Sequence, residues 1–294
     1  MSLFNDAKLI LTPNAYKAGK LYSIKPFDGS GDFDVVRATT AWRRNASGVW
    51  ESVANNVPRL HYPVGGGCPS CLVEPQRTNE IINSSFLNDG VNITTHTRTI
   101  SGSIIYFFTS TSDYFKLNIT GISGQRLHFS RTNTVINGET YILSCYVHVI
   151  SGNPIIRDIL FPTSIPINQT RVNGAVTPET NTIGGVGIYL IEMEITTTST
   201  SQSYRVGLGA ALTLTYSAQV EVYLPQLERG LTASSRILTT SATVTRNADV
   251  IDVTTPAGVT EIVETFADGT TNTETTIPAT YQLPNGEIKS IVMT

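Results

Sequence analysis

The sequence has little charge, and lysine in particular is scarce. Charged residues make up 15% of the 294 residues, against about 25% in ordinary globular proteins. Only 6 residues are lysine, whereas 41 are threonine. Surface helix formers are therefore few and β-branched residues many, which argues against a helical protein. The net charge of −3 and the lack of a dense basic stripe argue against nucleic-acid binding.

The chain also lacks long apolar runs and has few cysteines. No stretch of about 18 apolar residues is present, so the sequence predicts no membrane-spanning helix. The N-terminus has no apolar core of a secretory signal, and we expect folding in a reducing cytoplasm. Cys68 and Cys71 lack the following helix pattern of a redox site and the two further ligands of a zinc site. We expect small, partly buried thiols, with Cys145 in a strand core. Whether Cys68 and Cys71 pair stays open.

Signatures of common catalytic sites are absent as well. There is no phosphate-binding loop, no nucleophile elbow and no zinc-protease motif, and the four histidines are far apart in the sequence. Asp28, Asp32 and Asp34 surround a glycine-rich turn and could bind calcium, although a solvated turn is the ordinary interpretation. Glu192 and Glu194 share a strand face and could form a glycosidase pair, although an outer face is the ordinary interpretation. We therefore predict no catalytic residue, no cofactor and no metal site.

Alternating apolar residues mark strands in the middle of the chain. The pattern is clearest at residues 141–150, where Leu143, Cys145 and Val147 share one face. Similar patterns occur at residues 104–109, 114–119, 125–131, 187–196, 202–209 and 219–226. About eight short strands separated by turn signals predict a β-sandwich at residues 81–249.

Residues 1–80 form a first block in front of this predicted sandwich. Residues 40–44 and 49–51 predict a hairpin around an Asn-Ala-Ser-Gly turn. Four prolines after Trp50 exclude long helices. The block has too few apolar residues for a deep core, so we expect an extended β-module that lies along other chains.

Residues 250–294 form a last, acidic block. Together with Asp249 it contains seven acids and one basic residue. Two hairpins are predicted, one at residues 259–277 around an Asp-Gly turn and one at residues 281–293 around an Asn-Gly turn. A module this small is marginally stable alone, so we expect it to pack on the sandwich or to trimerise. The predicted fold class is all-β, with an extended N-terminal β-module, a β-sandwich and a small C-terminal β-hairpin module.

Arginine outnumbers acidic residues between positions 37 and 77. Arginine forms bidentate hydrogen bonds to carboxylates, which suits fixed interfaces. Trp42 and Trp50 are expected to form a cross-strand pair at a contact, with core packing as the alternative. Glu74 and Arg77 are expected to fix the linker between blocks, and exposed ion pairs worth under about 1 kcal/mol are the alternative. The candidate interface residues are Trp42, Arg43, Arg44, Trp50, Arg59, Glu74 and Arg77.

Three consecutive pieces of the first block are far from generic. Residues 31–51 read GDFDVVRATTAWRRNASGVWE, residues 56–62 read NVPRLHY, and residues 67–79 read GCPSCLVEPQRTN. In this order and spacing they resemble a module of tailed-bacteriophage virion proteins. That module occurs near the N-termini of tail fibres, head fibres and related appendages.

A second resemblance covers the end of the predicted sandwich. Residues 217–230 read SAQVEVYLPQLERG, residues 233–240 read ASSRILTT, and residues 244–249 read VTRNAD. These pieces are similar to the ending of carbohydrate-binding-like jelly rolls that follow the first module in phage proteins. The resemblance implies a jelly-roll topology. Leu224-Pro225 and Arg236 replace aromatic residues of the pattern, which weakens the implication that this copy binds sugar.

The two resemblances imply a non-enzymatic structural subunit of a tailed-phage particle, a head-fibre, tail-fibre or decoration protein. Its N-terminal part would anchor to other virion proteins, and its sandwich would project. The implied location is the virion, after synthesis in the host bacterial cytoplasm, and a homo-oligomer is expected, with a trimer favoured by analogy. Neither nucleic acid nor membrane insertion is expected. A glycan-binding adhesin for the host surface is the alternative, followed by a polysaccharide-degrading enzyme that uses Glu192 or Glu194.

Overall fold

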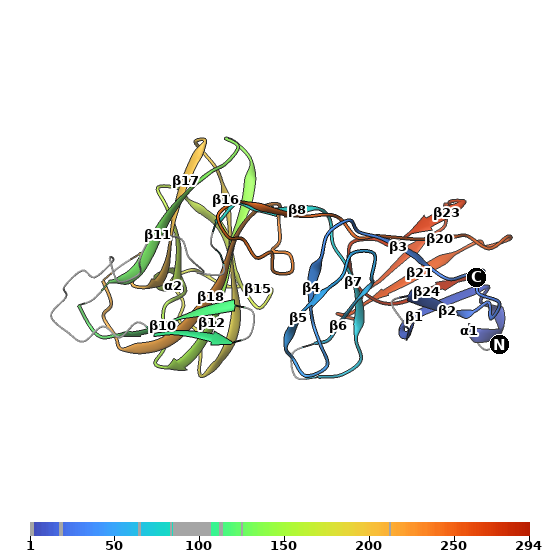
Figure 1. Cartoon of the computed structure of the whole chain (residues 1–294), viewed down its shortest axis with the longest axis horizontal. Helices are drawn as coiled ribbons and strands as arrows, with labels where there is room; N and C mark the ends of the chain where they lie inside the picture. Colours follow the sequence, from blue (N-terminus) through green and yellow to red (C-terminus); the bar gives the residue numbers. More distant parts are fainter. Residues whose placement is uncertain are drawn as a thin grey trace. The chain divides into compact units, whose positions relative to one another are not determined.

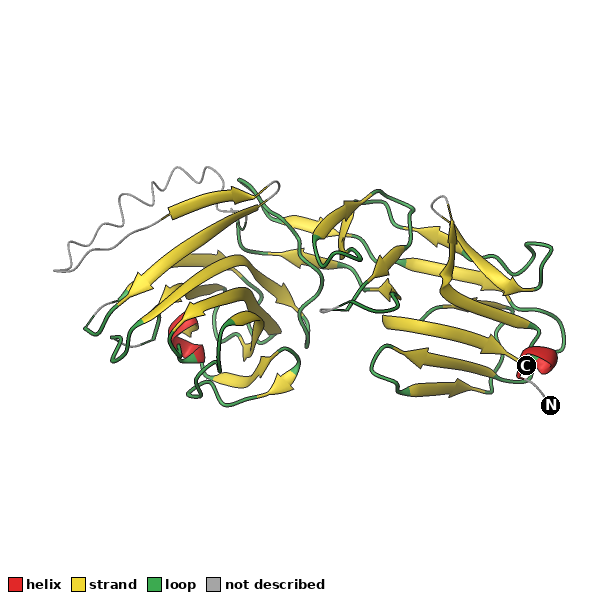
Figure 2. Cartoon of the chain, turned by 90° about the horizontal axis from the view of Figure 1, so that it is seen from below, coloured by secondary structure: helices red, strands yellow, loops and turns green. Residues whose placement is uncertain are grey.

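The computed structural model describes residues 3–17, 20–63, 66–82, 84, 107–111, 114–124, 126–211 and 213–294. The chain divides into two compact units (Figure 1): unit 1 comprises residues 1–77 and 246–294, and unit 2 comprises residues 78–245. The two helices of the described residues, α1 (Leu3–Asp6) and α2 (Ile156–Ile159), are single turns among many strands (Figure 2). The predicted all-β class is confirmed. No helix in this part of the chain is long and apolar enough to cross a membrane.

Unit 1 is built from strands at both ends of the chain. The first seven are β1 (Leu9–Lys17), β2 (Lys20–Lys25), β3 (Asp34–Val36), β4 (Ala41–Arg44), β5 (Trp50–Val53), β6 (Arg59–His61) and β7 (Ser70–Val73). The last five are β20 (Val250–Thr254), β21 (Ile262–Phe266), β22 (Thr271–Glu274), β23 (Thr280–Gln282) and β24 (Gly286–Met293). The largest sheet has the order β2-β1-β24-β21-β22, and β7 pairs with both β24 and β6. A sheet of order β23-β20-β3 and the hairpin β4-β5 complete the unit.

One hydrophobic core is shared by the two ends of the chain. β1 and β24 are antiparallel, with Leu9 opposite Met293 and Leu11 opposite Ile291, and all four side chains are buried. The same core includes Leu21, Phe33, Leu60, Cys71, Ile251 and Val253. This corrects the expectation of a coreless first block and a separate C-terminal module. Neither block has enough apolar residues alone, and each supplies the strands that cover the other.

Of the two hairpins predicted near the C-terminus, the structure contains one. The first is confirmed, because β21 pairs with β22 and Gly269 of the connecting turn has a φ of 86°. The second is wrong, because β23 pairs with β20 whereas β24 pairs with β21, β1 and β7. The backbone N–H of Leu283 donates to Ile251 O and so continues the β23–β20 pairing past the end of β23. The Asn-Gly turn therefore connects strands of two different sheets.

Unit 2 is a β-sandwich. Its seven-stranded sheet has the order β15-β14-β16-β12-β18-β10-β9, and its three-stranded sheet has the order β11-β17-β13. The strands of the large sheet are β9 (Phe107–Thr111), β10 (Tyr114–Gly121), β12 (Thr140–Ser151), β14 (Ile167–Val172), β15 (Ala175–Val176), β16 (Gly187–Thr196) and β18 (Ala218–Arg229). Those of the small sheet are β11 (Leu127–Thr134), β13 (Leu160–Thr163) and β17 (Ser201–Leu208). From β10 to β14 the chain alternates between the two sheets, β14, β15 and β16 follow one another in the large sheet, and β17 lies in the small sheet before β18 returns to the large one.

The core of unit 2 follows the alternation seen in the sequence. Leu143, Cys145 and Val147 of β12 are fully buried and pack with side chains of both sheets. The strands predicted at 141–150 and 187–196 are confirmed almost residue for residue. The strand predicted at 104–109 lies partly outside the described residues. The short strands β13, β14 and β15 have no clear alternation and were missed by the sequence patterns.

The chain passes twice between the units, and the two crossing strands pair with each other. They are β8 (Arg77–Asn79) and β19 (Val244–Arg246). Unit 2 is therefore an insertion into unit 1, with boundaries at 77/78 and 245/246 where the sequence suggested 80/81 and 249/250. The shift at the second boundary brings Arg246 and Asp249 into unit 1.

Ile291→Ala is expected to lower the free energy of unfolding of unit 1 by about 3 kcal/mol, because it removes buried methyl groups and leaves a cavity. Both tryptophans of the chain lie in unit 1, so tryptophan fluorescence during urea unfolding reports on this unit. Ile188→Ala is the matched control, since this isoleucine of unit 2 is exposed. Equal midpoints for the two variants would contradict a core shared by both chain ends.

Candidate functional site

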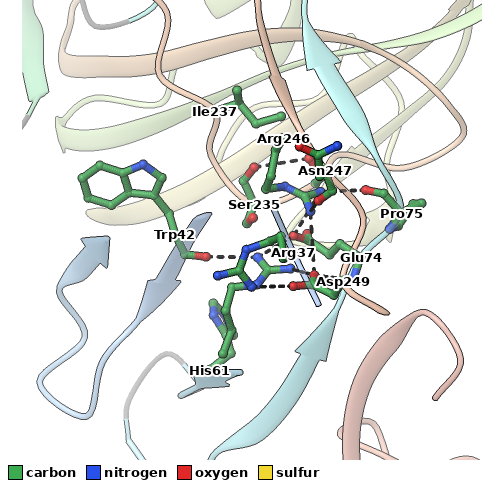
Figure 3. Close-up of polar contacts among 12 residues, drawn as sticks. Arg37, Trp42, His61, Glu74, Pro75, Ser235, Ile237, Arg246, Asn247 and Asp249 are labelled. Carbon is green, nitrogen blue, oxygen red and sulfur yellow. Dashed lines mark hydrogen bonds and ion pairs between the residues drawn. The ribbon is translucent and has the colours of Figure 1, made fainter. Parts of the chain in front are cut away.

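A buried network of arginines and carboxylates lies in unit 1, centred on Asp249 (Figure 3). Oδ1 of Asp249 accepts a hydrogen bond from Nη1 of Arg37 at 2.7 Å, and Oδ2 accepts from Nη2 of Arg59 and from the backbone N–H of Glu74. Both guanidinium groups and the Asp249 carboxylate are almost completely removed from solvent. Charges buried in this way need full pairing, since each one loses its hydration.

Arg37 ties the network to an irregular segment of backbone. Its guanidinium donates to the carbonyl oxygens of Thr39, Ala54 and Val57 at 2.6–3.1 Å. Its own N–H donates to the side chain of Asn56, which has a φ of 57°. Burial lowers the pKa of Arg37, and the hydrogen bond to Asp249 opposes that shift. Arg37 therefore fixes the backbone of residues 54–57, which belong to no sheet.

Arg59 and Arg246 share the second carboxylate, that of Glu74. Nη1 of Arg59 lies 2.7 Å from Glu74 Oε2, and Nη2 of Arg246 lies 3.3 Å from the same oxygen. Arg246 also donates to Pro75 O at 3.0 Å. Burial lowers the pKa of Arg59, but the charges of Glu74 and Asp249 outweigh it, so its pKa is raised overall. All of these arginines therefore stay protonated in the folded state.

These contacts correct two of the expected interface residues. Arg59 is completely buried, and the Glu74 carboxylate is largely covered. Both therefore serve the interior of unit 1 and not a surface that another chain could contact. Glu74 pairs with Arg59 and Arg246, whereas the Arg77 guanidinium donates to Gln76 O at 3.1 Å. Glu74 and Arg77, both expected to fix the linker between the blocks, therefore have different partners.

The other expected interface residues lie on the β4–β5 hairpin, which forms as predicted. Trp42 lies opposite Ser52 and Trp50 opposite Arg44, so the two tryptophans are diagonal neighbours across the hairpin and not directly opposite each other. Trp50 instead packs against His61, with ring centroids 5.5 Å apart, and under the Arg44 guanidinium at 5.8 Å. Trp42 contributes its carbonyl oxygen to Arg59.

Arg43 forms the outermost ion pair of the same hairpin. Its guanidinium lies 2.8 Å from Glu51, whose side chain is partly exposed. This pair matches the weak surface ion pair that was the alternative interpretation. It contrasts with the fully buried pairs around Asp249.

The pieces that resemble the jelly-roll ending hold a covering segment on unit 2. Glu228 is fully buried and accepts hydrogen bonds from the N–H and the hydroxyl of Ser234. Gln226 accepts from the N–H of Ile237, and Arg236 is itself buried. Residues 231–237 are therefore fastened along the outer face of the large sheet. Arg236 replaces an aromatic residue at a position that the structure buries.

The two glutamates considered for glycosidase chemistry lie in the same area. Glu192 is buried and accepts from the N–H of Ala233 at 2.9 Å. Glu194 lies 3.3 Å from Nη2 of Arg171. They share one strand face, as expected, but each carboxylate is held by a donor from unit 2.

Each resembling stretch ends in a buried polar residue. Asn79 closes the first stretch: its Oδ1 accepts from the N–H groups of Ile81 and Leu227, and its Nδ2 donates to Ile237 O at 2.9 Å. Asp249 closes the second stretch and centres the network of unit 1. No sequence pattern connects Arg37 with Asp249, because 212 positions separate the two residues.

The cysteines and the aspartate-rich turn were the places where the sequence left a metal site open. Among the described residues, no group of three or more His, Cys, Asp or Glu side chains could hold a metal ion. All three cysteines are free, with Cys68 exposed and Cys71 and Cys145 buried. Burial raises the pKa of Cys71 to about 12, so this thiol is inert at neutral pH. Asp28 accepts from Ser30, as in a simple turn.

No model of a known protein family matches the chain, and no curated protein sequence matches it. The similarity to phage virion modules therefore rests on the motif residues themselves. Their structural role in this chain is the two networks described above.

Asp249→Asn is expected to destabilise unit 1 by about 3–5 kcal/mol, because it leaves the guanidinium groups of Arg37 and Arg59 buried with reduced compensation. The unfolding midpoint followed by tryptophan fluorescence measures this loss. Glu51→Gln removes the partner of Arg43 in an ion pair that is partly exposed to solvent, and it should cost less than about 1 kcal/mol. If the two variants were equally stable, the Asp249 network would not be what holds unit 1 together.

His61 should make unit 1 sensitive to acid. Burial, followed by the charge of Arg44, lowers the pKa of His61 from 6.5 to about 4. The folded state therefore favours neutral His61, and stability is lost as the pH falls from 6.5 towards 4, by up to about 3 kcal/mol. Urea unfolding at pH 7 and pH 4.5 tests this, with His61→Gln expected to lose less stability than wild type. Carboxylates titrate in both proteins and cancel in the comparison. The same loss in both would exclude His61 as the cause.

Proposed function

We propose that the chain is a non-enzymatic structural subunit of a tailed-phage particle, a head-fibre, tail-fibre or decoration protein. Unit 1 attaches the subunit to other virion proteins, and unit 2 is the part that it presents. By analogy with fibres, the subunit forms a homo-oligomer, with a trimer favoured. The host, and the choice between head and tail, follow from the particle and not from this chain.

The observation that carries the proposal is where the motif residues lie. Arg37, Arg59 and Glu74 come from the stretch that resembles the N-terminal phage module. Arg246 and Asp249 come from the stretch that resembles the jelly-roll ending. All five meet in one buried network of unit 1. Residues used in this way build a rigid frame, which supports a role in architecture over a role in chemistry.

Mass spectrometry of purified particles, followed by a map of the particle, tests the proposal. The chain should be present in particles at a fixed copy number per attachment site and should appear in the map with the symmetry of that site. Particles that lack the chain, from cells in which it is abundant, would overturn the proposal.

One observation favours the adhesin as a second candidate. On the outer face of the large sheet, the rings of Tyr146 and Tyr223 stack at 5.6 Å, and His148 lies 2.9 Å from Glu221. A bulge with Leu224 at a φ of 54° lies next to this pair. Aromatic rings beside polar side chains are common in sugar sites. A glycan array with wild type and Tyr146→Ala tests this candidate, and binding that the variant lacks would support it. The enzyme has less support, since Glu192 and Glu194 are both held by donors within unit 2.

A further inference from the structure

Two phenylalanines of unit 1 are exposed and in contact, and nothing described so far uses them. Phe27 is 81% exposed and Phe4 is 43% exposed. Their ring centroids lie 6.4 Å apart. Single exposed apolar residues are ordinary, but an exposed pair of aromatic rings is a feature of interaction sites.

The turn that presents Phe27 is firmly held. The Ser23 hydroxyl donates to Pro26 O at 3.0 Å, and the Ser23 N–H donates to Asp32 Oδ1 at 3.0 Å. Gly31 packs so closely that a Cβ there would lie 2.6 Å from Cδ of Pro26. Phe27 is thus displayed on a fixed backbone, which reduces the entropy lost on binding.

A cation lies at the edge of the aromatic pair. Nζ of Lys25 lies 5.6 Å from the centre of the Phe4 ring and donates to the carbonyl oxygens of Phe4 and Asn5. Among the described residues Lys25 has no acidic partner, whereas Lys20 lies 3.5 Å from Asp32. Of the nearby acids, Asp28 holds its own turn through Ser30, and Asp6 is exposed on α1. We call Phe4, Lys25 and Phe27 the Phe27 patch.

We propose that the Phe27 patch is the docking surface of unit 1 for another virion protein, and that it binds a segment that presents an apolar side chain next to a carboxylate. The apolar side chain would cover Phe27 and Phe4, and the carboxylate would pair with the Lys25 ammonium. This inference rests on the proposed function and names the contact through which it operates. Aromatic centres with a charged rim are the usual composition of a tight contact.

Competition for incorporation into particles tests the patch. Wild type and a full-length variant are produced together in a host that assembles the phage, and their ratio in purified particles is compared with their ratio in the lysate. Phe27→Ser should be depleted on the order of tenfold or more, and Lys25→Glu by a smaller factor. Lys25→Arg keeps the charge and should be incorporated normally. Val49→Ser, which alters an exposed side chain elsewhere in unit 1, is the matched control.

The outcomes separate the patch from the proposed function. If wild type and Phe27→Ser are incorporated into particles equally well, the proposed role of the Phe27 patch is wrong and the proposed function stands. If wild type is absent from particles, both proposals are wrong. Unchanged tryptophan-monitored unfolding of Phe27→Ser shows that depletion is not misfolding. Sedimentation velocity of the purified proteins tests whether the patch instead binds a second copy of this chain. If wild type self-associates and Phe27→Ser does not, the partner is another copy of this chain and the proposed partner is wrong.

Discussion

The structure of unit 1 depends on the burial of one carboxylate, that of Asp249. Removing this charge from water is unfavourable, and it is offset because two guanidinium groups and a backbone N–H converge on the two oxygens. The Asp249 carboxylate and its three partners come from four separate parts of the chain, around positions 37, 59, 74 and 249. A network of this kind accepts very few alternative arrangements. It therefore specifies how loops without sheet pairing, such as residues 54–57, must run.

Local pattern was sufficient for the long strands of unit 2 and insufficient for the long-range strand pairing of unit 1. β12 and β16 alternate over ten or more residues, so their inner faces can be read directly from the sequence. β24 alternates as well, but its partners β1 and β7 lie more than 200 positions away. An Asn-Gly turn next to β24 predicted a local hairpin. In the structure β24 instead pairs with the distant strands β1 and β7. The unit boundaries predicted near residues 80 and 249 lie within a few residues of the observed ones, because the sequence motifs end there.

The same limit explains what the sequence could show of the candidate site. Arginine-rich composition pointed to fixed interfaces with other chains, whereas Arg37 and Arg59 form buried ion pairs within unit 1. It placed Arg59 and Glu74 at a surface because their partner Asp249 is 190 and 175 positions away from them. Exposed apolar side chains such as Phe27 follow no periodic pattern. Only the folded chain separates buried arginines from exposed ones and reveals an aromatic pair on a fixed turn.

The paired crossing strands β8 and β19 have a thermodynamic consequence for unit 2. While unit 1 is folded, both ends of residues 78–245 are held together, so an unfolded unit 2 is a closed loop and not a free chain. A crosslink that closes a loop of this size reduces the entropy of the unfolded state by an amount worth about 5 kcal/mol. Unit 1 thus acts on unit 2 as a non-covalent crosslink. The Asp249 network therefore stabilises unit 2 through the connectivity of the chain, and a single backbone cleavage within unit 2 would leave both fragments attached.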